Sequence, residues 1–160
     1  MKHLLVGRQA SVVSFASVFC LLTTSAFAAV TGKFLGNGQA AQLGHAVAQS
    51  ADPWQDEPTF SIVLCEKDPA TSENPSFYAS FGHLGHALTI RITESGQIIG
   101  TEVAHQALER AGFSTVGSLK VEDFAIANGT LRARFYTEGP QEFAGETWEV
   151  DLRVEVALPK

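Results

Sequence analysis

Large apolar side chains occupy every second position near the end of the chain, over residues 147–158. This set consists of Trp148, Val150, Leu152, Val154, Val156 and Leu158. Four of the six residues that alternate with them are charged. Successive side chains of a strand point to opposite faces, so a period of two places each set on its own face. The segment therefore predicts a long strand with one buried and one wet face, which is typical of an antiparallel sheet.

The dipeptide Asn128-Gly129 separates two further alternating segments, 122–127 and 130–136. Both central residues of a type I′ turn need a positive φ, which Asn and Gly adopt most readily. A two-residue turn here sets three facing pairs: Ile126 with Leu131, Phe124 with Ala133, and Asp123 with Arg134. Apolar residues meet apolar ones and an acid meets a base, so the sequence predicts a tight hairpin.

The rest of the chain carries several more strand patterns. We expect a hairpin of 88–92 with 97–103, a hairpin of 30–35 with 40–48 through Gly36-Asn37-Gly38, a central strand over 59–65 and a less regular one over 114–121. About eight strands at this spacing predict an all-β domain, either an antiparallel β-sandwich or a small β-barrel. The chain shows no repeat and no dividing linker, so residues 29–160 form one predicted domain.

Four segments are expected to connect these strands. Residues 50–58 and 66–76 are polar, acidic and contain Pro, which predicts irregular connections. Residues 106–112 are expected to form a turn or two of helix ending at Gly112. Residues 77–85 are aromatic and glycine-spaced, and Phe77, Tyr78 and Phe81 are expected to cover one end of the core.

The first 28 residues have the features of a secretory signal peptide. Lys2 and Arg8 supply positive charge, residues 12–22 are apolar, and Ala26-Phe27-Ala28 has the small-x-small pattern of a cleavage site. The apolar stretch is shorter than the roughly 20 residues that a spanning helix needs. We therefore expect cleavage after Ala28, export to the periplasm or the extracellular space, and no membrane insertion of the mature protein.

Removal of the leader changes the charge and the cysteine content. Nine basic side chains then remain against 17 acidic ones, so the net charge falls from −6 to −8. An acidic chain is a poor ligand for phosphate backbones, which argues against a nucleic-acid partner. Of the two cysteines only Cys65 remains, so no internal disulfide can form. The fold is expected to rest on its apolar core.

Histidines are the candidate metal ligands of the mature chain. His83 and His86 lie three residues apart between glycines, and His45 and His105 fall on alternating strand positions. A Zn or Cu site needs three or four such side chains to converge with supporting hydrogen bonds. Hydrogen-bonding or surface roles are the commoner fate of scattered histidines, so a His-based metal-binding protein is an alternative and no cofactor is expected.

Motifs of catalysis are missing from the sequence. It contains no G-x-S-x-G, no S-x-x-K and no phosphate-binding glycine loop. Cys65 ends an apolar strand without a basic neighbour, which favours a buried and inert thiol. The acidic segment 66–73 lacks the D-x-D-x-D-G spacing of calcium loops. These observations favour a protein that is not an enzyme.

Trp54 is the aromatic residue that most suggests ligand binding. It stands in a polar segment beside Asp52 and Asp56, where its flat ring could contact a protein or a glycan. The alternative is that Trp54 folds back to cap the core. The sequence thus predicts an exported binding module, and a closed barrel would instead permit a carrier of small hydrophobic ligands.

Overall fold

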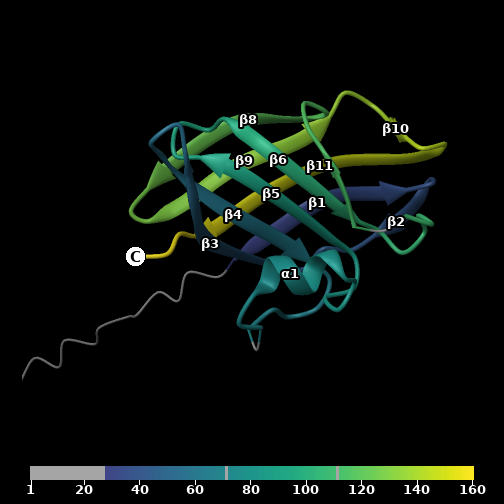
Figure 1. The fold of residues 1–160 in the computed structure, drawn as a ribbon, viewed down its shortest axis with the longest axis horizontal. Coiled ribbons are helices and arrows are strands. Elements are labelled where there is room, and N and C mark those ends of the chain that lie inside the picture. Colours follow the sequence, from purple (N-terminus) through teal and green to yellow (C-terminus); the bar gives the residue numbers. More distant parts are fainter. Residues whose placement is uncertain (1–27, 71, 111) are drawn as a thin grey trace, which may run out of the picture.

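The computed structural model describes residues 28–70, 72–110 and 112–160. Nearly all of the predicted leader, 1–28, lies outside the described residues. The described residues form eleven strands and one helix, arranged as two antiparallel sheets that face each other (Figure 1). The prediction of an all-β sandwich is thus confirmed, and the barrel alternative is not the fold that forms.

Sheet A contains both ends of the described chain. Its strands follow the order β2-β1-β11-β9-β8, and β10 pairs with β11 beyond the end of β9. The strands are β1 (Ala29–Gly36), β2 (Gln39–Ala41), β8 (Leu119–Ala127), β9 (Thr130–Thr137), β10 (Gln141–Phe143) and β11 (Glu146–Ala157). The first strand therefore pairs with the last, from Ala29 opposite Glu155 to Gly36 opposite Trp148.

Sheet B is a simple meander in sequence order, β3-β4-β5-β6-β7. Its strands are β3 (His45–Trp54), β4 (Glu57–Cys65), β5 (Ala87–Thr93), β6 (Ile98–Ala104) and β7 (Phe113–Thr115). A short helix, α1 (Pro75–Ser80), covers the outer face of this sheet (Figure 1). The expected β5–β6 hairpin and the expected central strand, now β4, are both present.

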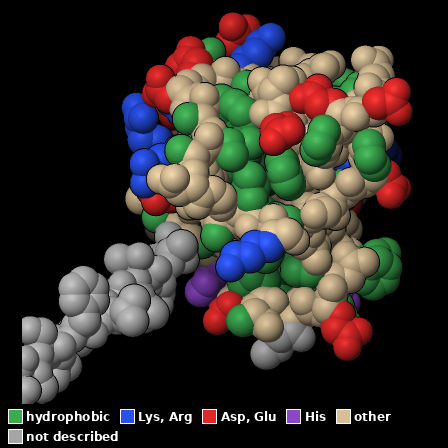
Figure 2. Space-filling view, turned by 90° about the vertical axis from the view of Figure 1, so that its left-hand side faces the viewer, with side chains coloured by type: hydrophobic (Ala, Val, Ile, Leu, Met, Phe, Trp, Pro, Cys, Tyr) green, Lys and Arg blue, Asp and Glu red, His purple; other side chains and the backbone are tan. Residues whose placement is uncertain are grey.

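The alternation over 147–158 is realised in β11. All five apolar residues of the pattern that fall within the strand are buried: Trp148, Val150, Leu152, Val154 and Val156. They meet Ile62, Leu64, Leu88, Ile90 and Ile92 of sheet B in one continuous core between the sheets. Half-buried apolar side chains extend this core to the surface at the end of the sandwich shown in Figure 2, where charged side chains surround them.

The Asn128-Gly129 turn forms as predicted, but the register beyond it differs. Both residues have positive φ, 52° and 72°, and Ile126 faces Leu131. The pairing then shifts, so that Glu122 rather than Asp123 faces Arg134, and Phe124 does not face Ala133. Asp123 itself takes a φ of 52°, which inserts one extra residue as a β-bulge.

Two connections differ from the sequence prediction. The expected strand 40–48 is divided, because the chain leaves sheet A after Ala41 and crosses to sheet B as β3. Residues 50–58, predicted to be irregular, instead form the end of a tight β3–β4 hairpin. Its two turn residues, Gln55 and Asp56, have φ of 52° and 67°, so a pair without glycine adopts the conformation that usually favours Asn-Gly.

The short helix also lies elsewhere than expected. Residues 106–110 form turns instead, and the Gly112 N–H donates to the Val103 carbonyl over 2.8 Å. Helix α1 begins within the segment predicted to be a connection. Asn74 caps it by accepting from the Phe77 N–H at 3.2 Å, and Pro75 is its first residue. Both residue types are favoured at these positions.

Candidate functional site

Helix α1 has one face against sheet B and one face in solvent. Its buried residues, Pro75 and Ala79, are small. Ala79 packs in a second apolar cluster with Val63, Cys65 and Ala87 on the outer face of the sheet. A six-residue helix offers only one narrow face to a sheet, and these small side chains occupy it. The larger side chains of the segment must therefore point away from the core.

Three large aromatic side chains occupy the solvent face. Phe77 is 54% exposed, Tyr78 41% and Phe81 65%. Positions 77 and 81 are one helical turn apart, so their rings are neighbours on the helix surface. The expectation that these residues cover the core is thus wrong. The missed signal is Asn-Pro followed by this spacing, which marks a helix start and one aromatic face.

The rings contact one another in a chain. The centroids of Phe77 and Phe81 are 4.7 Å apart, those of Phe77 and Tyr78 5.9 Å, and those of Tyr78 and the exposed His83 5.6 Å. We call Phe77, Tyr78, Phe81 and His83 the aromatic cluster. Contiguous exposed apolar surface is rare on a solitary soluble domain and marks sites of interaction.

Hydrogen bonds hold the aromatic cluster in place. The hydroxyls of Ser76 and Ser61 lie 2.8 Å apart and join the helix to β4. The His83 backbone N–H donates to the Tyr78 carbonyl at 3.0 Å, and this bond ties the segment after the helix back to the helix. Because the backbone is fixed before any partner arrives, binding loses less conformational entropy here than on a flexible loop.

A polar depression lies beside the helix on the outer face of sheet B. Its volume is about 280 Å³, and Ser76 contributes to its wall. The other polar side chains of the lining are Ser61, Thr89, Arg91, Thr101, Glu102, Ser114 and Thr115. Apolar rings and a hydroxyl-lined hollow therefore adjoin at Ser76, which resembles the apolar centre and polar rim of protein interfaces.

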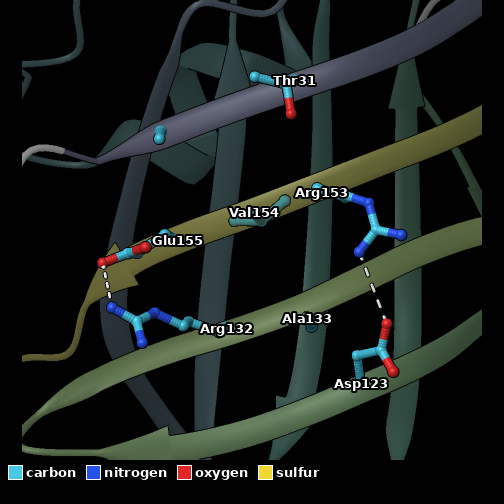
Figure 3. A pocket seen from close by; sticks show the side chains of 8 residues that line it. Thr31, Asp123, Arg132, Ala133, Arg153, Val154 and Glu155 are labelled. Atoms are coloured by element: carbon cyan, nitrogen blue, oxygen red, sulfur yellow. Dashed lines mark hydrogen bonds and ion pairs between the residues drawn. The ribbon is translucent and has the colours of Figure 1, made fainter.

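The outer face of sheet A is charged but internally paired. Arg134 donates to both carboxylate oxygens of Asp151, at 2.8 and 2.9 Å, and to Glu122 at 2.7 Å. The hydrogen bonds from Arg134 hold the pKa of Asp151 below its usual value. A depression of about 390 Å³ lies on this face (Figure 3), where Arg132 pairs with Glu155. Its charges satisfy each other, so it offers little free charge to a ligand.

The sequence-predicted histidines divide into three places. His45 begins β3 and lines a groove beside that strand, whereas His83 belongs to the aromatic cluster. His86 and His105 come together, with ring centroids 4.4 Å apart. Within 28–70, 72–110 and 112–160, no three His, Cys, Asp or Glu side chains are placed to hold a metal ion.

The His86–His105 pair makes hydrogen bonds that do not suit a metal. Nδ1 of His86 accepts the Gln106 N–H at 3.3 Å, and Nδ1 of His105 accepts the Ala107 N–H at 3.1 Å. A metal-binding histidine instead donates its second ring N–H to an acceptor, which frees the other nitrogen. His105 is almost fully buried, and burial together with His86 lowers its pKa to about 4.

Trp54, Asp52 and Asp56 lie at the tip of the β3–β4 hairpin. All three are exposed, with Trp54 at 44%. The tip is at the far end of β3 from His45, which faces Cys65 beneath α1. A ten-residue strand is roughly 30 Å long, so Trp54 is remote from the aromatic cluster.

Cys65 lies at the other end of the same hairpin and is buried. Its burial, aided by the charge of Asp68, raises the thiol pKa to about 11. Since the thiolate is the nucleophile, such a thiol is inert at neutral pH.

Fold and surface together define an antiparallel β-sandwich domain with an exposed aromatic cluster on a short helix. Comparison of the chain with known protein families, with curated proteins and with solved structures finds no match. No helix among the described residues has the length and apolar character needed to cross a membrane.

Proposed function

We propose that this protein is an exported, non-enzymatic binding module that holds a protein partner on its aromatic cluster. The observation that carries the proposal is the chain of exposed rings on α1, of which Phe77 and Phe81 are more than half exposed. Aromatic side chains at the centre of an interface contribute much of the binding free energy. The predicted leader, 1–28, supports an exported role, and its removal would leave a net charge of −8.

The ring geometry favours a protein over a glycan. Phe77 and Phe81 are inclined at 45° to each other, and Phe77 and Tyr78 at 88°. These rings form an uneven surface with gaps, whereas the flat face of a sugar stacks best on a flat ring surface. Edge-to-face geometry is how aromatic and aliphatic side chains interlock in protein cores and interfaces.

The other functions suggested by the sequence receive less support. A carrier needs space inside the sandwich, but a continuous cluster of buried side chains occupies the region between the sheets. A His-based metal protein needs convergent ligands, but His45, His83 and the His86–His105 pair lie apart. Trp54 remains a second candidate contact, and it serves as the comparison in the following test.

The test compares three proteins produced from the full-length sequence: the wild type, a Phe77→Ser/Phe81→Ser variant and a Trp54→Ser variant. Each is immobilised and offered both a glycan array and the exported proteins of the source cells. All three substitutions are at exposed positions, so thermal unfolding is expected to change little.

The expected result is that one exported protein binds to the wild type and to the Trp54→Ser variant but does not bind to the Phe77→Ser/Phe81→Ser variant. A protein that the double variant retains as strongly as the wild type would place the contact elsewhere. Loss in Trp54→Ser alone would move the site to the hairpin tip, and glycan binding that depends on Phe77 and Phe81 would overturn the partner class.

A further inference from the structure

Strand β3 ends sheet B and is an open edge. It pairs with β4 over residues 45–51, from His45 opposite Cys65 to Ala51 opposite Thr59. No other strand among the described residues pairs with it. The backbone N–H and C=O groups on its free side are therefore available to a further strand, which makes such an edge a template for pairing.

The other strands that end a sheet are protected in ways that residues 45–51 of β3 are not. Strand β7 and the small strands β2 and β10 have three residues each. Strand β8 is long, but it carries Lys120, Glu122 and Asp123 and is bent by the bulge at Asp123. Short length, charge and bulges are the usual defences of an edge. Residues 45–51 of β3 contain no Asp, Glu, Lys or Arg.

Space for a further strand exists beside β3. A groove of about 730 Å³ lies there, lined by His45, Val47 and Gln49 from the strand. Ala28, Asp68 and Pro69, together with Pro75 at the start of α1, also line this groove. Alanines at 46, 48 and 51 keep the edge free of bulky side chains.

We propose that the occupant of this edge is β3 of a second copy, paired antiparallel about a two-fold axis at Ala48. In an antiparallel ladder, residues facing each other must both direct their backbone groups toward the partner or both away from it. A symmetric pairing is therefore centred on a residue rather than between two, and Ala48 is the middle of 45–51.

The resulting register contains no conflict of charge or size. Val47 faces Gln49 of the partner subunit, His45 faces Ala51 of the partner subunit, and Ala46 faces Ser50 of the partner subunit. Seven paired residues provide roughly six to eight backbone hydrogen bonds. The dimer joins the two sheets B into one and pairs both β3 edges with each other, so this contact is closed at two copies. This inference concerns a different surface from the aromatic cluster and does not depend on it.

The test uses two variants that alter the same positions and differ only in charge. In Val47→Lys/Gln49→Lys, each Lys faces a Lys of the partner across the edge. In Val47→Lys/Gln49→Glu, each Lys faces a Glu. Both are produced from the full-length sequence, and their mass is measured by light scattering against concentration, with thermal unfolding recorded for each.

The measured mass of the wild type is expected to rise toward twice the mass of one chain as the protein concentration increases. The Lys/Lys variant is expected to dissociate at roughly tenfold or more higher concentration than the Lys/Glu variant, and salt is expected to narrow this difference. A wild type that stays monomeric at all concentrations, an oligomer larger than two, or equal association of the two variants would overturn the proposal.

A second pair of variants tests the register without added charge. Ala48→Cys places two thiols directly opposite each other at the two-fold axis, so mild oxidation is expected to link the copies. In Ala46→Cys the two new thiols lie four residues apart along the edge, roughly 13 Å, beyond the reach of a disulfide. Cross-linking that is equal at both positions, or absent at Ala48, contradicts the pairing.

Discussion

Gly36 lies directly against the ring of His105. A Cβ on Gly36 would overlap Nδ1 and Cγ of that ring, which also meets Phe34 edge-on with centroids 5.0 Å apart. The end of β1 can thus approach the buried imidazole only because residue 36 has no side chain. The contact joins the first strand of sheet A to the segment after β6 in sheet B.

Replacement of Gly36 by Ala is therefore expected to destabilise the fold by roughly 1–3 kcal/mol, the usual cost of overpacking a core. Urea unfolding measures this change. Gly44→Ala is the control, because nothing lies within 4 Å of a Cβ at that position. In a His105→Ala background, Gly36→Ala should cost much less. An unchanged cost there would show that the strain comes from another contact.

Stability is expected to fall as the pH drops from 6.5 toward 4, in part because of His105. Its pKa in the folded protein is about 4, well below the ordinary value of 6.5, so the unfolded chain takes up the proton first. Proton uptake by the unfolded chain therefore lowers the free energy of unfolding across this pH interval, by on the order of 2–3 kcal/mol. Unfolding midpoints measured from pH 7 to pH 4 should fall more steeply for the wild type than for His105→Leu. Parallel curves would contradict this assignment.

The two tryptophans are expected to differ sharply in their contribution to stability. Trp148 is 2% exposed and packs against Phe113, whereas Trp54 is 44% exposed. Trp148→Ala should lower the free energy of unfolding by roughly 3–5 kcal/mol through cavity formation. Trp54→Ala should change it by only about 0.5 kcal/mol. Fluorescence quenching by iodide gives an independent reading, since only Trp54 should be accessible.

The thiol of Cys65 is expected to be unreactive in the folded protein. Burial hides it and raises its pKa to about 11, so a disulfide reagent at neutral pH should react only after denaturation. The denatured exported protein should then show one thiol per chain, because Cys20 belongs to the predicted leader. Two thiols per chain would contradict cleavage after Ala28, and rapid labelling of the native protein would contradict the burial of Cys65.

Local patterns with a direct physical meaning predicted most of the fold. The alternation in β11 and the Asn128-Gly129 turn are each decided by a few neighbouring residues. The Gln55-Asp56 turn and the bulge at Asp123 were not predictable in this way, because neither site contains a glycine that would mark a positive φ in the sequence. The crossing after Ala41 likewise depends on distant partners, since β1 pairs mainly with β11.

The candidate site was harder to predict for a similar reason. Aromatic residues in a glycine-spaced segment are usually buried, and their exposure depends on what occupies the inner face of α1. Pro75 and Ala79 occupy it, so Phe77 and Phe81 remain outside. The pairing of His86 with His105 depends on the turn after β6, which no local pattern indicates.

Strand β11 is the last of the described strands along the chain, yet it pairs with β1, β9 and β10. A chain translocated from its N-terminus would deliver β1 first and its main pairing partner last. Under the proposed export, sheet A would gain its shared strand only after almost the whole chain has passed. The strand order would thus delay completion of this sheet until the chain has been delivered.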